Sequence, residues 1–224
     1  MLLAIDTATR VTGLALYDQA NGRVLAEETW TSNDNHSVEL MPRLAALLAQ
    51  QGVAPADLTG LVVSQGPGSF TGLRTGLSLA KGLALARGLP LVGVPTLDVT
   101  ARPHFGQHLP VWAILQAGRG RLCAGRYLRR HGRWLREGDY VLAAVEGLAA
   151  QIEVPALLCG EIDRAEIDVL RRHLGDTAVF PPPSACLRRA SVLAEIGWER
   201  LERGNADDAA SLQAVYLHHP PIDG

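Results

Sequence analysis

The side chains best placed for chemistry near the start of the chain are one carboxylate and two hydroxyls. The string AIDTATRVTG carries Asp6, Thr7 and Thr9 just after an apolar run that is predicted to be a strand. Such groups can face the phosphates of a nucleotide, but no lysine or glycine-rich loop accompanies them to neutralise phosphate. They can equally hold a tight turn by bonding backbone amides. Both interpretations stay open, and nucleotide binding here is expected to be weak or vestigial.

A glycine-rich corner, SQGPGSFTGLR, is the most distinctive string in the chain. Its glycine spacing matches neither the P-loop pattern GxxxxGK[ST] nor the dinucleotide pattern GxGxxG. Gly66 and Gly68 permit backbone angles that a side chain would forbid, Pro67 stiffens the turn, and Ser69 can cap the following helix. We therefore predict a structural turn at Gly66, Pro67, Gly68 and Ser69, and not a phosphate-binding loop.

Two histidines four residues apart, His104 and His108 in HFGQH, raise the question of a metal site. On a helix both rings would lie on one face, yet Pro103 precedes the pair and Gly106 divides it, which disfavours a helix. The segment contains no carboxylate that could complete a ligand set. We predict a loop with two solvated histidines and no metal.

Composition narrows the class of protein. The chain has 224 residues, of which 47% are hydrophobic, and a formal net charge of −2, which argues against nucleic-acid binding by overall charge. Its three cysteines, Cys123, Cys159 and Cys186, form no CxxC pair and no even-numbered disulfide framework. The N-terminus lacks the pattern of a signal peptide, and no apolar stretch is long enough to span a bilayer. We expect a cytoplasmic protein without membrane contact.

The hydrophobic pattern predicts a unit that occurs twice. Up to Pro95 the pattern indicates three strands, a helix, a strand, a second helix and a further strand. A similar series follows after Pro95. We expect an α/β protein with the actin-like nucleotide-binding (ASKHA) fold, in which each of two lobes is a mixed sheet of the βββαβα type. The lobes are expected at 1–98 and 99–224, with the return of the C-terminal segment to the first lobe left open. The expected strands are 2–7, 12–18, 23–30, 61–65, 89–94, 110–116, 121–130 and 133–142, with short apolar runs at 155–159 and 177–180, and the main helices are 36–51 and 70–87.

Several strings together resemble one known family. The chain resembles the bacterial TsaB (YeaZ) family in the strings LLAIDTAT, NHSVELMPRL, SQGPGSFTGLRTGLSLAKGLA and LPLVGVPTL. Matching residues are frequent over residues 1–100 and sparse afterwards. The resemblance implies an actin-like fold and the dimerization subunit of the complex that makes N6-threonylcarbamoyladenosine at position 37 of tRNA. It further implies pairing with the catalytic paralogue TsaD, joining by the small ATPase TsaE, and contact with tRNA through the complex.

The resemblance also implies a non-catalytic role, which the sequence allows us to examine. TsaD-like paralogues carry a metal-binding HxxxH after a strand similar to LPLVGV, whereas Thr96 and Thr100 stand here. Hydroxyls are poor ligands for a transition metal compared with imidazole. We expect no catalytic residue, no metal and no cofactor of its own, leaving ATP or ADP as candidate ligands of the assembled complex. The alternative is an enzyme, either an actin-like kinase or a glycoprotease-like metallohydrolase.

The two main helices are the expected partner surface. The helix 71–87 is apolar around much of its girth, so one side would pack on its own sheet and the other on another molecule, unless a large lobe buries it fully. His36 matches the NHS string of the family and either pins the start of the first helix at the partner surface or is an ordinary polar residue at a helix start. We expect half of a four-helix bundle with TsaD and a homodimer when the chain is alone. The expected contact residues are His36, Leu40, Leu44, Leu47, Leu73, Gly76, Leu77 and Ala80.

The second half departs from the family. Where relatives show an Asp-Ala-Arg string, this chain has Gln116 in place of the acid and Gly118 in place of the arginine. Several arginines follow in a short stretch. They either contact tRNA phosphates or lie on a solvated hairpin. We favour the solvated hairpin, because this chain uses arginine almost everywhere as its basic residue and has a single lysine, Lys81. These arginines are Arg119, Arg121, Arg126, Arg129, Arg130, Arg133 and Arg136.

Overall fold

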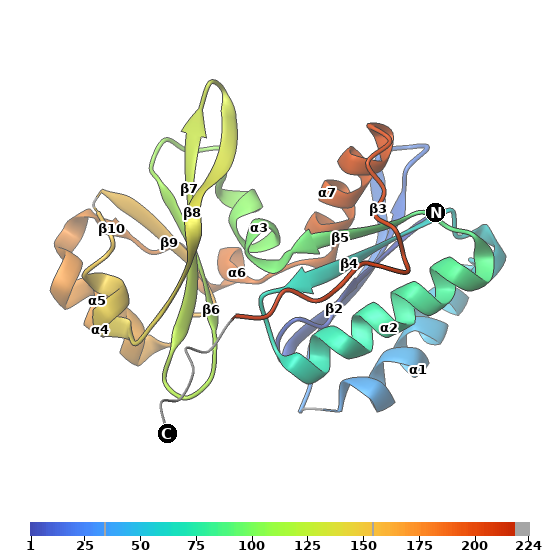
Figure 1. The fold of residues 1–224 in the computed structure, drawn as a ribbon, viewed down its shortest axis with the longest axis horizontal. Coiled ribbons are helices and arrows are strands. Elements are labelled where there is room, and N and C mark those ends of the chain that lie inside the picture. The colour runs from blue at the N-terminus through green and yellow to red at the C-terminus, as the bar shows by residue number, and fades with distance from the viewer. Residues whose placement is uncertain (34, 154, 218–224) are drawn as a thin grey trace. The chain divides into compact units, whose positions relative to one another are not determined.

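The computed structural model describes residues 1–33, 35–153 and 155–217. The chain forms two compact units, one made of Met1–Thr96 with the segment from Arg189 onward and the other of Leu97–Arg188 (Figure 1). We had placed the boundary after residue 98 and left the C-terminal segment open. In the structure that segment packs on the sheet of the first unit.

The first unit is built on a mixed five-stranded sheet. β1 lies at its centre, antiparallel to β2 and parallel to β4, and the strand order is β3-β2-β1-β4-β5. β1 is buried along its whole length, as expected for a central strand covered on both faces. The strands are β1 (Leu2–Asp6), β2 (Val11–Asp18), β3 (Arg23–Thr31), β4 (Gly60–Gly66) and β5 (Leu91–Pro95).

Helices α1 (His36–Gln50) and α2 (Phe70–Arg87) cover one face of this sheet, and α7 (Ala190–Glu202) covers the other (Figure 1). Leu3 and Ile5 of β1 belong to the same hydrophobic core as the buried leucines of α1 and α2. On the other face α7 packs so closely that a Cβ on Gly197 would lie 2.3 Å from a methyl group of Val62. A 3₁₀ turn at Pro55–Asp57 precedes β4.

The chain after α7 runs back along the first unit. An isolated bridge pairs Asp207 with Leu91 of β5, and the amide of Val215 donates to the carbonyl oxygen of Gln65 at 2.8 Å. The ammonium group of Lys81 on α2 donates to the carbonyl oxygens of Ala210 and Leu212, at 3.1 and 3.0 Å. The only lysine of the chain therefore holds this return segment against α2.

The second unit repeats the topology of the first. Its strand order is β10-β9-β6-β7-β8, with β6 central, antiparallel to β7 and parallel to β9. Reversed, to β8-β7-β6-β9-β10, this order matches that of the first sheet strand by strand, so the predicted repeat of two βββαβα units is confirmed. The strands are β6 (Val111–Gln116), β7 (Leu122–Arg130), β8 (Arg133–Ala143), β9 (Ala156–Gly160) and β10 (Ala178–Val179).

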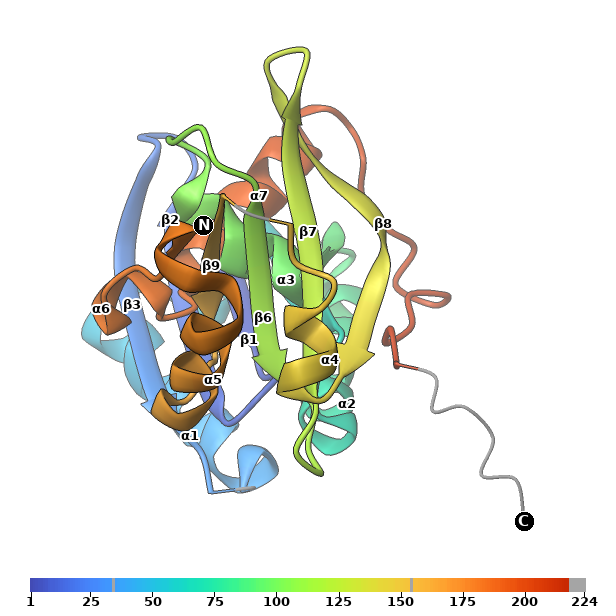
Figure 2. The same cartoon turned by 90° about the vertical axis from the view of Figure 1, so that its left-hand side faces the viewer.

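Helices α4 (Val145–Ala149) and α5 (Arg164–Leu174) cover one face of the second sheet (Figure 2). Their buried Leu148 and Leu170 share a core with Ile114 of β6 and Leu158 of β9. The remaining elements are α3 (Thr96–Ala101), α6 (Pro183–Cys186) and 3₁₀ turns at Arg102–His104 and Gly175–Thr177. No helix within the described residues is long and apolar enough to cross a bilayer.

Candidate functional site

The turn between β1 and β2 is locked to the start of α2 through Thr7. Its amide donates to the hydroxyl of Ser64 on β4 at 3.3 Å, and its hydroxyl donates to the carbonyl oxygen of Gly72 at 2.7 Å. Thr7 is completely buried. These bonds join the turn to two segments, β4 and the start of α2, that lie more than fifty residues further along the chain, because β1 and β4 are adjacent in the sheet.

The other two polar side chains of this turn bond its own backbone. A carboxylate oxygen of Asp6 accepts from the amide of Ala8 at 3.0 Å, and the hydroxyl of Thr9 accepts from the amide of Val11 at 3.2 Å. Asp6 is 2% exposed and Thr9 is 7% exposed. This geometry favours the turn-holding interpretation of the three residues, and nucleotide binding at Asp6, Thr7 and Thr9 stays a prediction.

The glycine-rich corner packs directly on this turn. The amide of Ser69 donates to the carbonyl oxygen of Ala8 at 2.6 Å, and the hydroxyl of Ser69 accepts from the amide of Gly72 at 3.3 Å as the N-cap of α2. A Cβ on Gly68 would lie 2.2 Å from the carbonyl oxygen of Ala8, closer than any side chain can approach. Gly66 has φ of +113°, a region that favours glycine, and precedes a cis bond to Pro67. The corner therefore brings two backbones together and starts a helix.

His36 joins the start of α1 to the same turn. It is 2% exposed, and its Nε2 lies 3.1 Å from the carbonyl oxygen of Thr9. Because a carbonyl oxygen can only accept, Nε2 carries the proton in this contact. The predicted pinning of the helix start is thus an internal contact of the first unit, between α1 and the β1–β2 turn.

The structure buries all eight residues that we had expected at a partner interface. Seven of them are at most 5% exposed, and the eighth, Gly76, is also buried. The seven are His36, Leu40, Leu44, Leu47, Leu73, Leu77 and Ala80. A Cβ on Gly76 would lie 2.2 Å from the hydroxyl oxygen of Thr7. These residues form the side of α1 and α2 that packs on the sheet, so the candidate contact surface moves to the opposite side of both helices.

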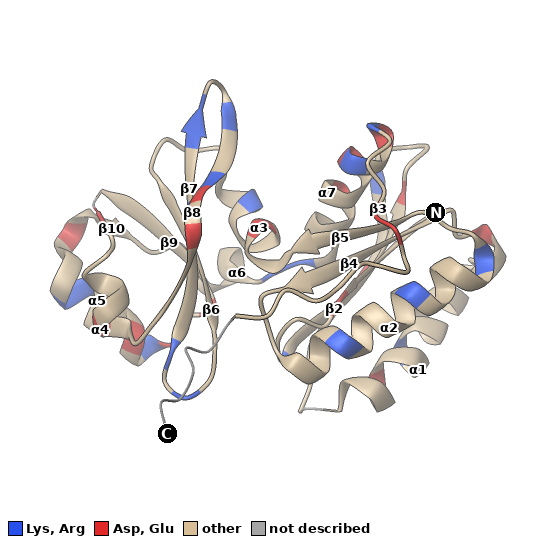
Figure 3. Cartoon of the chain, in the orientation of Figure 1, with Lys and Arg blue, Asp and Glu red and all other residues tan. Residues whose placement is uncertain are grey.

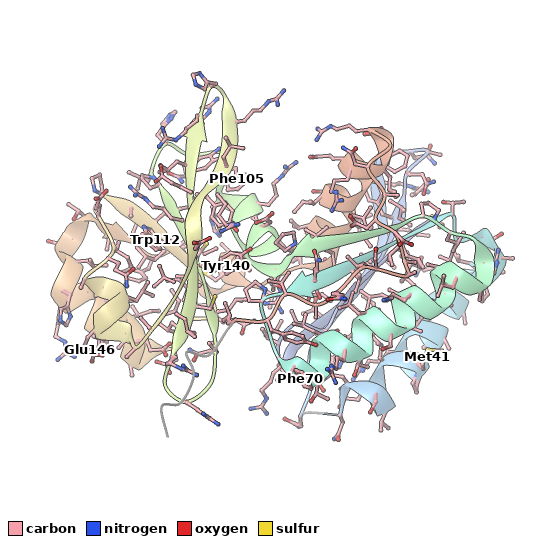
Figure 4. All side chains as sticks on the ribbon, in the orientation of Figure 1. Met41, Phe70, Phe105, Trp112, Tyr140 and Glu146 are labelled. Carbon is pink, nitrogen blue, oxygen red and sulfur yellow. The ribbon has the colours of Figure 1, made fainter. Side chains whose placement is uncertain are left out.

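That opposite side, here called the α1–α2 outer face, is mostly uncharged. On α1 it consists of Val38, Met41, Pro42, Ala45 and Ala49, where Val38 is 71% and Met41 is 52% exposed. Figure 4 labels Met41 on this helix. On α2 it consists of Thr71, Arg74, Ser78, Gly82, Leu85 and Ala86, all exposed, of which Arg74 is the one charged residue.

The apolar pattern of α1 does not by itself distinguish the side that packs on the sheet from the outer side. Apolar residues occur on both sides of α1, with leucines at 40, 44, 47 and 48 and smaller or more flexible residues at 38, 41, 45 and 49. Burying a leucine removes more apolar area from water than burying an alanine, so the leucines take the sheet side. The size difference is the sequence feature that could have identified the outer face.

An aromatic cluster lies at the N-terminal end of α2, beside the outer face. The ring of Phe70, labelled in Figure 4, lies 5.1 Å from that of Tyr216, measured between centroids. The guanidinium of Arg74 lies 3.8 Å from the Phe70 centroid, and its Nε donates to the Tyr216 hydroxyl at 3.1 Å. Phe70 is nevertheless 53% exposed. The sequence analysis missed this cluster because Tyr216 is remote in the chain.

The departures from the family in the second unit have a local physical explanation. The amide nitrogen of Gln116 donates to a carboxylate oxygen of Glu166 at 2.6 Å, a bond that an ionised aspartate could not make. Gly118 has φ of +72°, where glycine is favoured over arginine. Both replacements suit the turn between β6 and β7 and its neighbour α5.

The histidines of HFGQH do not share a helix. His104 ends the 3₁₀ turn Arg102–His104, and His108 lies in the loop that follows. Burial lowers the pKa of His104 below the usual value of the imidazole group. Across the part of the chain that the structure describes, no three His, Cys, Asp or Glu side chains gather as a metal-binding group.

The predicted arginines lie at both ends of the β7–β8 hairpin. Arg119 and Arg121 occur in the turn before β7, Arg129, Arg130 and Arg133 at the far end, and Arg136 further back on β8, opposite Tyr127. Arg126, between them, pairs with Glu137 at 3.1 Å and with Glu153 at 3.0 Å. The set therefore does not form one continuous patch.

Comparison with known proteins places the chain in a family. The model of the family described as "TsaD: tRNA N6-adenosine threonylcarbamoyltransferase" matches residues 23–174, more than half of the chain. The chain is 31% identical to the tRNA threonylcarbamoyladenosine biosynthesis protein TsaB of Bacillus subtilis, over 96% of this chain and 93% of that protein.

Solved structures agree with this result. YeaZ from Pseudomonas aeruginosa superposes with a TM-score of 0.78 at 25% identity, covering 96% of this chain and 99% of that one. The ethanolamine utilization protein EutJ from Carboxydothermus hydrogenoformans, at 14% identity and a TM-score of 0.50, covers 86% of this chain and 89% of its own and supports the actin-like fold alone. The family predicted from the motifs is thus confirmed, and the chain belongs to the bacterial TsaB (YeaZ) family of actin-like proteins.

Proposed function

We propose that this chain is a non-catalytic, activating subunit in the formation of N6-threonylcarbamoyladenosine at position 37 of tRNA. Its curated relative from Bacillus subtilis is named as a biosynthesis protein of that nucleoside, and the matching family model is that of the transferase TsaD. In this proposal the α1–α2 outer face binds TsaD, and TsaE and tRNA join through the complex.

The observation that carries the proposal is the concentration of exposed apolar side chains on α1 and α2. Among the described residues ten large hydrophobic side chains are exposed, and four of them, Val38, Met41, Phe70 and Leu85, lie on these two helices. Apolar surface that is left exposed over neighbouring elements is the kind of surface that other proteins bind. Small residues along the outer side of α2 permit close approach of another helix, as in a helical bundle.

The β1–β2 turn supports a subunit without catalysis of its own. Asp6 and Thr7 are buried and already hydrogen-bonded, Asp6 to the amide of Ala8 and Thr7 to Ser64 and to the first turns of α2. Binding a nucleotide through them would require breaking bonds that hold the turn and its contact with α2. ATP or ADP is then proposed as a ligand of the assembled complex and not of this chain alone. The isolated chain is proposed to form a homodimer through the same outer face.

The experiment that tests the proposal measures complex formation with the TsaD of the same organism by size-exclusion chromatography. Met41→Glu and Gly82→Arg place charges on the outer face, and neither site carries a packing role, since Met41 is 52% exposed and a Cβ on Gly82 meets nothing within 4 Å. Both variants should fold as the parent does, fail to bind TsaD and lose tRNA modification in a reconstituted reaction. Val179→Glu, at a 42% exposed apolar position on β10, is the matched control and should retain both properties.

Two results would contradict the proposal. If Met41→Glu and Gly82→Arg both bind TsaD as the parent does, the outer face is not the contact surface. If the isolated parent chain transfers phosphate from ATP or cleaves a peptide bond at a rate that depends on Asp6, the enzyme alternative holds. Circular dichroism of each variant separates loss of binding from loss of fold.

A further inference from the structure

The far end of the β7–β8 hairpin extends beyond the sheet to which it belongs. β6 pairs with β7 only as far as Tyr127, opposite Val111, whereas β7 and β8 continue to pair until Arg130 lies opposite Arg133. Residues 128–135 therefore form a two-stranded arm with no third strand beside it (Figure 1). One face of the arm packs on Phe105 through Trp134, and the exposed side chains of its two strands are available to a ligand.

The arm is braced on one face, close to its tip, although two-stranded hairpins are only marginally stable in water. The ring of Trp134 stacks on that of Phe105, with centroids 4.7 Å apart and planes 3° from parallel. The indole nitrogen of Trp134 also donates to the carbonyl oxygen of Phe105 at 2.7 Å. A braced arm presents its end in a defined position, which reduces the entropy lost when a ligand binds it.

The arm is strongly basic in a chain that is otherwise slightly acidic. The eight residues of the arm, 128–135, include three arginines and no aspartate or glutamate, while the whole chain has a net charge of −2. At the far end Arg129, Arg130 and Arg133 are all exposed. Figure 3 shows the arginines at this end of the hairpin, and the first acid on the strand, Glu137, lies nearer the sheet.

The placement of these charges works against the stability of the free protein. Arg130 and Arg133 lie directly opposite each other, and like charges at such cross-strand positions destabilise a hairpin. Arg130 gains an ion pair with Glu137, but Arg133 lies one position beyond the turn, further from that acid. Local destabilisation of this kind is characteristic of residues kept for binding.

We infer that the far end of the β7–β8 arm is an RNA-binding element that contacts backbone phosphates through Arg129, Arg130 and Arg133. Register puts Arg130 and Arg133 on one face of the arm and Arg129 on the other, because successive side chains of a strand alternate in direction. Positive charge on both faces suits a ligand that surrounds the arm with negative charge, as two phosphate strands or a folded RNA do. A flat acidic protein surface would engage one face only.

The inference rests on the proposed function for the identity of the RNA, which is tRNA, and adds the element by which this chain contacts it. Arginine forms bidentate bonds with phosphate, and each contact neutralises one backbone charge and releases a counterion. The contact is independent of base sequence, so it would position the tRNA without selecting it.

The test measures binding of the full chain to a fluorescein-labelled unmodified tRNA transcript by fluorescence anisotropy over a series of salt concentrations. Arg129→Gln with Arg133→Gln removes two charges from the arm. Affinity at low salt should fall about tenfold, and the slope of log K against log salt should become less steep by about 1.5, as expected for two lost phosphate contacts. Arg164→Gln with Arg172→Gln, both exposed on α5, removes the same charge from elsewhere in the same unit and should bind as the parent does.

A charge-conserving variant and a measurement of TsaD binding complete the test. Arg129→Lys with Arg133→Lys retains the charge and should restore most of the affinity and the salt slope. The inference is overturned if the arm and α5 variants weaken binding equally, if the parent chain does not bind the transcript, or if the arm variant loses TsaD binding while RNA binding is unchanged. Because RNA binding is measured on this chain alone, its failure is distinguishable from failure of the α1–α2 outer face to bind TsaD.

Discussion

The hydroxyl of Thr7 donates a 2.7 Å hydrogen bond to the carbonyl oxygen of Gly72, which makes the β1–β2 turn and the first turns of α2 one packed body. The contact leaves no room for side chains on the facing side of the helix. A Cβ on Gly72 would lie 2.2 Å from the Thr7 carbonyl oxygen, and one on Gly76 would lie 2.2 Å from its hydroxyl oxygen. The glycines of α2 therefore differ in role according to the side of the helix on which they lie.

Two glycine substitutions in the same helix should have opposite effects on stability. Gly76→Ala introduces a methyl group against Thr7 and should lower the free energy of unfolding by about 1–3 kcal/mol, the usual cost of overpacking. Gly82→Ala, where a Cβ meets nothing within 4 Å, should raise it by about 1 kcal/mol through helix propensity. Urea denaturation of both variants and the parent provides the comparison, and a stabilising Gly76→Ala would show that α2 does not pack on Thr7.

Replacing Asp6 should lower the stability of the fold and should have little effect on nucleotide binding. Asp6→Ala removes the acceptor of the Ala8 amide in a buried turn, at a cost of about 1–3 kcal/mol in the free energy of unfolding. The isolated parent chain should bind ATP weakly and hydrolyse it no faster than background. Calorimetry that shows tight ATP binding by the parent and none by a folded Asp6→Ala would instead support a kinase-like site.

The outer face should also govern the association state of the chain alone. Exposed apolar area is driven out of water at about 25 cal/mol per Å², so the parent should self-associate at high concentration. Met41→Glu should shift the mass measured by light scattering toward the monomer, since Met41 is 52% exposed on α1. Val179→Glu on β10 serves as control, and equal masses for the parent and both variants would mean that α1 takes no part in self-association.

Titration of the Asp98 carboxyl group should make the free energy of unfolding depend on pH. Burial raises its pKa, while the Tyr127 hydroxyl, which donates to it at 2.6 Å, acts in the opposite direction. A raised pKa means that the folded state binds the proton more tightly than the unfolded state, so this stabilisation is complete below the unfolded pKa of about 4 and is lost as pH rises through the folded pKa.

Asp98→Asn keeps an acceptor for Tyr127 without a charge. The free energy of unfolding of the parent, relative to this variant, should therefore fall as pH rises from about 4 toward neutrality. Thermal or urea unfolding over that range provides the measurement. Asp139→Asn, exposed on β8, is the control and should follow the pH profile of the parent. Parallel profiles for the parent and Asp98→Asn would show that the Asp98 carboxyl is solvated.

The three cysteines should differ in reactivity. Burial raises the pKa of Cys123 to about 12 and raises that of Cys159 as well, so neither forms the nucleophilic thiolate at pH 8. Cys186 on α6 is partly exposed. Iodoacetamide at pH 8 should label Cys186 first, as read by peptide mass spectrometry, and all three in denaturant. Labelling of Cys123 as fast as Cys186 in the native protein would be inconsistent with its buried position on β7.

The sequence by itself was sufficient for the strands, the two main helices and the repetition of the unit, but not for the bounds of α7, which covers one face of the first sheet. Strand periodicity and the glycine-rich corner predicted β1 to β4 and α2 to within a residue or two. These features are local, because backbone geometry within a strand, a turn or a helix depends on neighbouring residues. The family motifs are likewise contiguous strings, which is why the family could be recognised from them.

Only the tertiary structure decided which side of each helix is covered. The helix α2 is apolar around much of its girth, so periodicity assigns no unique wet face. The partner of Thr7 is a backbone carbonyl sixty-five residues away, and that of Gly76 is Thr7 itself, so neither could be read from neighbouring residues. The sheet brings these segments together by pairing β1 with β4, and packing then makes Leu40, Leu73 and Leu77 core while it leaves Val38 and Met41 exposed.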